Sequence, residues 1–211
     1  MKVAIINYGN GNFGSLVAAF QRLDIHPQIW SHGRDVNKVN LVVFPGVGAL
    51  PDVMTSLTRN QLLDPLTAMH QNGTPFFGIC LGMQLFFGPG DEGGSGLGWL
   101  PGHSPSLKAP ILPHIGWNTV RAVPDHAWLY ANLPPDPAFY FVHTYRTAPH
   151  DLSIVAGLTT YEEQFPSMVA SQGLTGVQFH PELSGPAGQQ ILVNVLERSS
   201  SALDTPFEEE P

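Results

Sequence analysis

An apolar run that stops at the only cysteine of this chain constrains its fold more than any other feature. Residues 75–79 read Pro-Phe-Phe-Gly-Ile, Cys80 follows, and the sequence then continues with an amphipathic pattern. This order favours a buried strand, a sharp turn and a helix. Gly78 and Gly82 flank the cysteine, and small neighbours of this kind allow the backbone to pack closely around a strained turn.

Two interpretations of Cys80 remain open from this pattern alone. In the first, the thiol is a nucleophile at the start of a helix, where the helix dipole and unpaired N–H groups favour the reactive thiolate. The N–H of Leu81 could then face a developing oxyanion. In the second, Cys80 is a buried structural cysteine, which is the usual state of a lone one.

A histidine and a carboxylate far downstream favour the first interpretation. Residues 176–179 resemble a strand and are followed by His180, Pro181 and Glu182. A thiol nucleophile needs a base, and the base needs an orienting group. Because residues i and i+2 of an extended segment point the same way, Glu182 is expected to reach the distal ring nitrogen of His180. The alternative is a solvated loop that carries an ordinary histidine and glutamate.

Both motifs resemble the signature of class I glutamine amidotransferases. They are Gly-Ile-Cys-Leu-Gly-Met-Gln at 78–84 and Gln-Phe-His-Pro-Glu at 178–182. Within that family, segments 7–12, 44–48 and 112–118 are similar to those of the glutaminase subunits of imidazole glycerol phosphate synthases. The last of these segments, Leu-Pro-His-Ile-Gly-Trp-Asn, is the most specific pointer to that group.

The resemblance covers residues 1 to about 198 and implies an enzyme. Its catalytic residues would be Cys80, His180 and Glu182, which hydrolyse glutamine to glutamate and ammonia through a γ-glutamyl thioester. No cofactor and no metal are expected from the residues themselves, because no Walker lysine follows the glycine-rich turn at 9–12 and the nine histidines lack zinc spacing. The resemblance also implies a partner, a (β/α)8-barrel cyclase of histidine biosynthesis that uses the ammonia to make imidazole glycerol phosphate and an aminoimidazole carboxamide ribotide.

The resemblance assigns roles to further residues. They are the oxyanion donors Gly46, Val47, Gly48 and Leu81, the glutamine binders Gln84, Thr144 and Tyr145, and the partner contacts Asn10, Asn12, Trp117, Asn118 and Leu183. Family members commonly have a lysine at the last position, thought to pair with an acid on the cyclase. Leu183 cannot form that ion pair, and an apolar contact is the simplest substitute.

The order of apolar segments predicts the fold class. Strands at 3–6, 41–44 and 75–79 alternate with helices at 15–23 and 51–70, the second of which could break near Asn60 or Pro65. This alternation predicts an α/β protein with a doubly wound, mostly parallel sheet and helices on both faces. Its ligand site belongs at the carboxyl ends of the strands, where Gly46, Gly48 and Cys80 all stand.

The second half of the chain carries shorter strand-like segments. They predict an antiparallel or mixed extension of the sheet after residue 97. The glycine-rich stretch 88–96 is a candidate mobile loop. A helix at 186–198 is expected to close a single domain, 1–198, and residues 199–211 are expected to form an acidic, flexible tail.

Composition restricts the classes of partner. The 211 residues carry a net charge of −8, which argues against nucleic acid or an anionic membrane as the main partner. Only 12% of residues are charged, so an extensive protein interface is plausible. One cysteine cannot form an internal disulfide, and no apolar run reaches the roughly 18 residues of a membrane span. Without a recognisable secretory signal, a cytoplasmic enzyme is expected.

Two other functions remain open at this point. The chain could be the glutaminase component of another synthase, making anthranilate, aminodeoxychorismate or pyridoxal phosphate. It could also be a binding module that keeps the scaffold without catalysis, although the presence of Cys80, His180 and Glu182 weakens that possibility.

Overall fold

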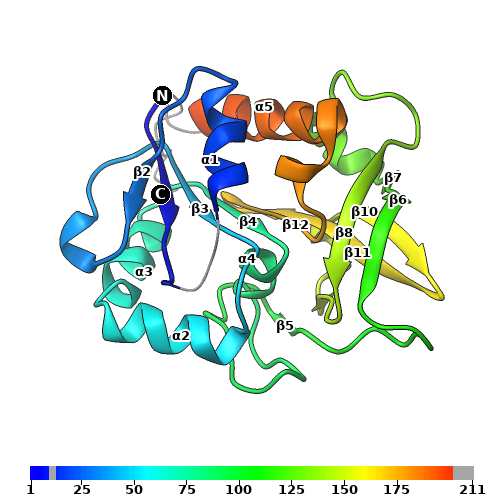
Figure 1. The fold of residues 1–211 in the computed structure, drawn as a ribbon, viewed down its shortest axis with the longest axis horizontal. Helices are drawn as coiled ribbons and strands as arrows, with labels where there is room; N and C mark the ends of the chain where they lie inside the picture. The colour runs from blue at the N-terminus through cyan, green and yellow to red at the C-terminus, as the bar shows by residue number, and fades with distance from the viewer. Residues whose placement is uncertain (10–12, 202–211) are drawn as a thin grey trace, which may run out of the picture.

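A computed structural model describes residues 1–9 and 13–201 of the chain, and an eight-stranded sheet runs through the middle of the molecule (Figure 1). Its strands are β1 (Val3–Ile6), β2 (Gln28–Trp30), β3 (Leu41–Phe44), β4 (Phe76–Ile79), β7 (Arg121–Ala122), β10 (Val155–Tyr161), β11 (Glu163–Ser171) and β12 (Leu174–Val177). Their order across the sheet is β2-β1-β3-β4-β12-β11-β10-β7. The first five strands in this order are parallel, and the last three continue the sheet in antiparallel fashion.

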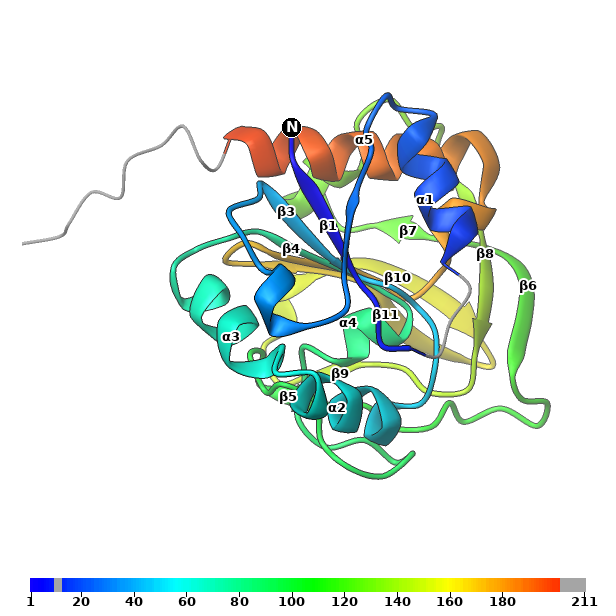
Figure 2. The same cartoon turned by 60° about the vertical axis from the view of Figure 1, so that its left-hand side comes forward.

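Helices cover both faces of this sheet, as the alternation of segments predicts. They are α1 (Gly14–Gln21), α2 (Leu50–Arg59), α3 (Leu63–Gln71) and α5 (Gly185–Ser201). Figures 1 and 2 show α1 and α5 on one side of the sheet and α2 and α3 on the other. Ile5 packs in one buried cluster with Phe20 of α1, whereas Ile6 packs in the other with Leu57 of α2. The predicted break near Asn60 is confirmed, because α2 ends at Arg59.

The antiparallel character of the second half is also confirmed. Two smaller sheets pair β6 (His114–Thr119) with β8 (Ala138–His143) and β5 (Gly102–His103) with β9 (Ala148–Pro149). Within residues 1–9 and 13–201 there are also four 3-10 turns: η1 (Gly33–Asp35), η2 (Pro124–Tyr130), η3 (Leu152–Ile154) and η4 (Pro181–Leu183). In Figure 1, β6 and β8 lie beside β10 and β11.

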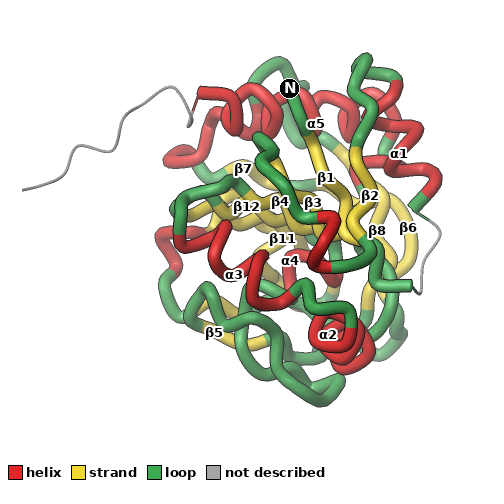
Figure 3. Tube along the Cα trace, turned by 90° about the vertical axis from the view of Figure 1, so that its left-hand side faces the viewer, coloured by secondary structure: helices red, strands yellow, loops and turns green. Residues whose placement is uncertain are grey.

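The helix expected after Cys80 is much shorter than predicted. It is the single turn α4 (Leu81–Gln84), which lies near the middle of the molecule in Figure 3. It ends there because the following carbonyl groups accept hydrogen bonds from another segment: Leu97 N–H donates to Leu85 O at 2.7 Å and Leu100 N–H to Phe86 O at 2.8 Å. A single turn supplies little dipole, so the argument that a helix favours the thiolate is wrong in its strong form.

The glycine-rich stretch 88–96 forms hydrogen bonds to two other segments through its two acidic side chains. Asp91 Oδ2 accepts the N–H of Ser106 at 3.0 Å, and Glu92 Oε2 accepts the N–H of Leu50 at the start of α2, at 2.8 Å. These bonds connect the stretch to Ser106 and to the start of α2. Its predicted mobility stays a prediction.

The last helix extends slightly beyond the end of the predicted domain. α5 continues to Ser201, three residues beyond the expected boundary at 198, and the rest of the predicted tail lies outside the described residues. Asn10 and Asn12 also lie outside them. Across 1–9 and 13–201, no helix combines the length and hydropathy needed to cross a bilayer.

Candidate active site

The backbone at Cys80 forms a strained turn between β4 and α4. Its φ of 51° and ψ of −108° lie in a region that side chains other than glycine rarely adopt. The flanking glycines make this turn possible. A Cβ on Gly78 would clash with Gly82 O, and one on Gly82 would clash with Phe44 O. The turn therefore sits directly against the end of β3.

His180 and Glu182 follow the end of β12, and the contact between them differs from the one expected. His180 Nδ1 lies 2.8 Å from Glu182 Oε1. Glu182 therefore bonds to the ring nitrogen nearer the backbone, and the prediction of the distal nitrogen is wrong. The segment is also not extended, because Pro181 starts the 3-10 turn η4 that curls Glu182 back toward the ring. This arrangement leaves Nε2 as the ring nitrogen available to another group.

The thiol and the imidazole meet at the carboxyl edge of the sheet. The His180 ring lies against Cys80, and this contact is one of the causes that raise the pKa of the imidazole. Gly46, just after β3, makes the space for this contact, since a Cβ there would lie 2.8 Å from both Cys80 Cβ and His180 Cε1. The structure thus joins sulfur, imidazole and carboxylate in one contiguous chain.

The protonation of His180 follows from its two partners. Burial lowers the pKa of the imidazole, but the interactions with Cys80 and Glu182 outweigh burial and raise the pKa to about 10. An imidazolium between a sulfur and a carboxylate is the charge state that suits a thiolate nucleophile. Glu182 Oε2 is buried and accepts no hydrogen bond from the described residues.

A cavity of about 270 Å³ opens onto the sulfur. Cys80 is 7% exposed and is one of the residues that line this cavity, so it is not sealed in the core. The volume suits a ligand the size of an amino acid. The lining residues are Gly46, Gly48, Cys80, Leu81, Gln84, Glu92, Pro113, Val142, His143, Thr144 and Tyr145.

Most residues predicted for catalysis and glutamine binding converge here. Three of them do not line the cavity: His180 lies beside Cys80, Glu182 contacts Nδ1 of His180, and Val47 lies in the loop between Gly46 and Gly48. The N–H groups of Val47, Gly48 and Leu81 make no hydrogen bond to any described residue. Unpaired N–H groups beside a nucleophile are what an oxyanion site requires.

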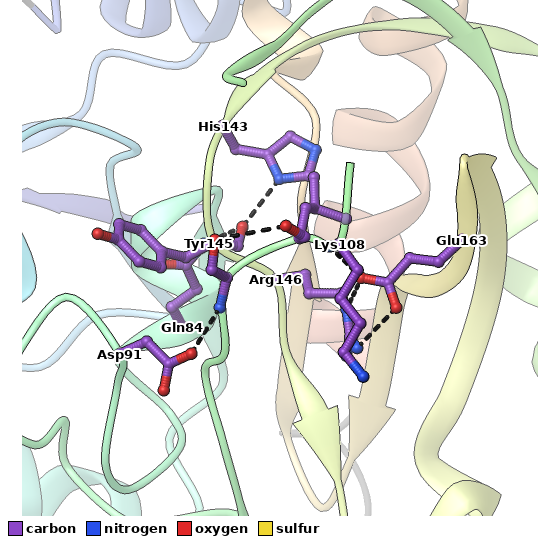
Figure 4. Close-up of polar contacts among 9 residues, drawn as sticks. Gln84, Asp91, Lys108, His143, Tyr145, Arg146 and Glu163 are labelled. Carbon is purple, nitrogen blue, oxygen red and sulfur yellow. Dashed lines mark hydrogen bonds and ion pairs between the residues drawn. The ribbon is translucent and has the colours of Figure 1, made fainter. Parts of the chain in front are cut away.

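Gln84 contributes differently from a simple ligand binder. Its Nε2 donates to Tyr145 O at 3.0 Å and to Gln178 Oε1 at 3.3 Å. Both N–H groups are thus used within the protein, and only Oε1 remains for a ligand. The segment after β8 that carries Tyr145 is held in place by the next residue, because Arg146 forms a two-point ion pair with Glu163 at 2.8 and 3.0 Å (Figure 4).

Sequence reasoning missed several residues of the cavity. Glu92 supplies a carboxylate to it, and the acidic pair within an otherwise uncharged glycine-rich stretch was the available signal. Pro113, Val142 and His143 also line it. His143 is buried, and its Nδ1 donates to the Tyr145 carbonyl at 2.8 Å (Figure 4). No sequence pattern distinguishes these three from core residues.

The predicted partner contacts lie outside the cavity. Trp117 is 59% exposed and packs edge-on against Tyr140 across the β6–β8 pair. Ile115 and Val142, paired in the same register, are also exposed, so one face of this pair is apolar. Asn118 instead turns its amide inward to Thr160 O, at 2.9 Å. Leu183 is 44% exposed.

Comparison with known proteins decides the family. The model of the family "Glutamine amidotransferase class-I" matches residues 4–198. This chain belongs to the class I glutamine amidotransferase family. The HisH subunit of imidazole glycerol phosphate synthase from Moorella thermoacetica is 39% identical over 195 residues, covering 91% of this chain and 92% of that protein. The HisH subunit from Carboxydothermus hydrogenoformans is 41% identical over 196 residues, covering 92% and 98%.

Solved structures agree on the amidotransferase fold. A putative GMP synthase component from Thermoplasma acidophilum has a TM-score of 0.72 at 15% identity, covering 97% of this chain and 96% of that one. PurLQS from Thermotoga maritima has a TM-score of 0.74 at 15% identity, covering 93% and 98%. In the described ranges of this amidotransferase, no group of three or more His, Cys, Asp or Glu side chains is arranged to hold a metal ion.

Proposed function

We propose that this chain is the glutaminase subunit of an imidazole glycerol phosphate synthase. The observation that carries the proposal is the contact of Cys80 with His180 and of His180 with Glu182, with Cys80 lining an amino-acid-sized cavity. Its similarity to two HisH subunits over nine-tenths of its length selects this synthase among those that class I amidotransferases serve.

The reaction starts from the ion pair in which the Cys80 proton already resides on His180 Nε2. The thiolate attacks the side-chain amide carbon of glutamine, and the unpaired N–H groups of Val47, Gly48 and Leu81 are available to the oxyanion. The His180 imidazolium then protonates the leaving ammonia. Water hydrolyses the thioester to glutamate, with His180 again as the base.

The cavity offers matching groups to the rest of glutamine. Among the described residues that line it, Glu92 carries the one carboxylate; this group has one oxygen left after Oε2 accepts the Leu50 N–H, and it can pair with the α-ammonium group. Oε1 of Gln84 can accept from a substrate N–H, and Thr144 and Tyr145 line the same cavity. These contacts orient the substrate and leave its side-chain amide toward the sulfur.

The partner is a cyclase that consumes ammonia. Ammonia released into neutral water becomes ammonium, which has no lone pair to donate, so direct transfer to the acceptor enzyme is favourable. The apolar face of Ile115, Trp117, Tyr140 and Val142 is suited to bind such a partner. This face adjoins the catalytic residues, because Tyr140 O accepts the His180 N–H at 2.9 Å and Val142 O lies 3.8 Å from Cys80 Sγ.

The test is a glutamate-release assay of the full chain, alone and mixed with a candidate barrel cyclase and its phosphoribosyl nucleotide. We expect release to rise several-fold or more when the liganded cyclase is present, with transfer of nitrogen to the nucleotide. Anthranilate, aminodeoxychorismate and pyridoxal phosphate synthases serve as comparison partners. Nitrogen transfer with one of these, and none with the cyclase, would contradict the proposal.

A further inference from the structure

Gln178 contacts the reacting sulfur, although the mechanism above gives it no task. It directly follows β12, its side chain is fully buried, and its Nε2 lies 3.5 Å from Cys80 Sγ. It does not line the cavity. The group therefore reaches the nucleophile from the side of the core, opposite to the substrate.

The direction of this hydrogen bond is fixed by two other groups of the same hydrogen-bond network, the Gln84 amide and the Tyr145 carbonyl. The carbonyl of Tyr145 can only accept, so the Gln84 amide must turn its nitrogen toward it. The second hydrogen of that nitrogen goes to Gln178 Oε1. Because the oxygen of Gln178 is held in this way, its nitrogen must face the sulfur. The reversed amide would bring two NH₂ groups together and point an oxygen at Sγ.

A pair of buried histidines contacts the end of this hydrogen-bond series that is farthest from the sulfur. His143 Nδ1 donates to the same Tyr145 carbonyl, so the Nε2 of the neutral ring accepts from His114 Nδ1, at 3.0 Å. Burial lowers the pKa of His143 to about 3 and also lowers the pKa of His114, so both rings are neutral at pH 7. Each hydrogen bond in the series from His114 of β6 to the Cys80 sulfur therefore has a fixed donor and a fixed acceptor.

We propose that Gln178 stabilises the thiolate of Cys80 by a directed N–H···S hydrogen bond, and that Gln84 is the positioning residue that keeps its amide in the donating orientation. A hydrogen bond to a charged acceptor is stronger than one to a neutral acceptor, so this donor favours thiolate over thiol. The single turn of α4 contributes little to the same task. The proposal rests on the glutaminase function only for the identity of the group that the thiolate attacks.

The reactivity of the Cys80 thiol tests the proposed role of Gln178 directly, because Cys80 is the only cysteine of the chain. The rate of alkylation by iodoacetamide, followed by intact mass across pH 5.5 to 9.5, reports the thiolate without any need for glutamine. Gln178→Met keeps a similar volume and removes the donor. We expect its alkylation profile to move to higher pH and its rate at pH 7 to fall about tenfold or more.

Two further variants separate this role from simple core packing. Gln84→Met leaves Gln178 in place but frees its amide to reverse, so we expect a smaller shift in the same direction. The double variant is expected to match Gln178→Met, because the effect of Gln84 on the sulfur runs through Gln178. Gln71→Met, at the exposed end of α3, is the matched control and should alkylate as the unaltered chain does.

The outcomes are distinct from those of the glutaminase assay. Alkylation profiles of folded Gln178→Met and Gln84→Met that coincide with that of the unaltered chain would overturn the proposal and leave Gln178 a core residue. If Gln178→Met does not fold, Gln84→Met alone decides in the same way. A shifted profile in a chain that hydrolyses no glutamine with any partner would support the role of Gln178 and contradict the proposed function.

Discussion

Ile79 of β4 lies opposite Val177 of β12, and this register pair accounts for the meeting of two distant motifs. The residue after Ile79 is Cys80, and the chain reaches His180 three residues after Val177. Because both strands run in parallel and end at the same edge, their following residues lie together. The backbone also links them, since Cys80 N–H donates to Val177 O at 2.7 Å.

Gly46→Ala should separate the nucleophile from its base. The added methyl group would meet Cys80 Cβ and His180 Cε1 at 2.8 Å, so one of the two side chains must move. We expect glutamine hydrolysis in the presence of the partner to fall about 100-fold, as misplaced catalytic groups do. Steady-state kinetics with a thermal melt will show whether the loss occurs in a folded protein. Unchanged kcat in this variant would contradict the described contact.

Glu182→Gln tests the charge beside His180. The amide oxygen can still accept from Nδ1, but the negative charge is lost, so the pKa of His180 should fall from its raised value. We expect kcat/KM at pH 7 to drop about 100-fold. The measurement is the pH profile of glutamate release. Glu197→Gln, on the exposed side of α5, is the matched control, and equal profiles for the two variants would refute the role of Glu182.

The buried His143 predicts a loss of stability in acid. Burial lowers its pKa to about 3, whereas the unfolded chain keeps the ordinary value of 6.5. Below pH 6.5 the unfolded state therefore binds a proton that the folded state excludes, so the free energy of unfolding falls as the pH falls toward 3. Between pH 6.5 and 5 this amounts to about 2 kcal/mol.

The measurement is the melting temperature of two variants, His143→Asn and His26→Asn, each at pH 7.5 and at pH 5. Asparagine at 143 can still donate to the Tyr145 carbonyl but cannot be protonated, so its melting temperature should change less with pH. His114, whose pKa burial also lowers, should preserve part of the dependence. His26 is exposed, and its variant should keep the full dependence. Equal pH dependence in both variants would rule out the buried histidine as the source.

Trp117→Ala should weaken partner binding without weakening the fold. Its side chain is largely exposed on the β6–β8 face, and aromatic anchors often dominate interfaces. We expect the dissociation constant for the cyclase, measured by titration calorimetry, to rise about tenfold or more. Leu152→Ala, an exposed apolar residue of η3, is the control. Unchanged cyclase affinity of the tryptophan variant would place the interface elsewhere.

The parallel half of the fold was predictable because its signals are local, whereas the catalytic roles of Cys80, His180 and Glu182 stay a prediction. Apolar runs define β1, β3 and β4, and the motifs around Cys80 and His180 carry the chemistry. The nitrogen that Glu182 contacts was predicted wrongly because Pro181 starts a turn where an extended segment was assumed. The length of α4 was also missed, because it depends on pairing with residues 97–100.

The residues around the sulfur show where sequence reasoning stops. Gln178 and His143 look like ordinary members of buried strands, and their roles depend on hydrogen bonds to partners far along the chain. Glu92 stands in a stretch without regular structure, so no periodicity directs it to the cavity. Such positions follow only from the assembled tertiary structure.

The most direct test of the account is to look for the covalent intermediate on Cys80. The full chain, mixed with liganded cyclase and radiolabelled glutamine, is quenched in acid within milliseconds and digested. We predict label on the peptide that carries Cys80, up to one equivalent per chain, and neither label nor glutamate release in Cys80→Ala. Release of glutamate by Cys80→Ala at the rate of the unaltered chain would contradict the central claim.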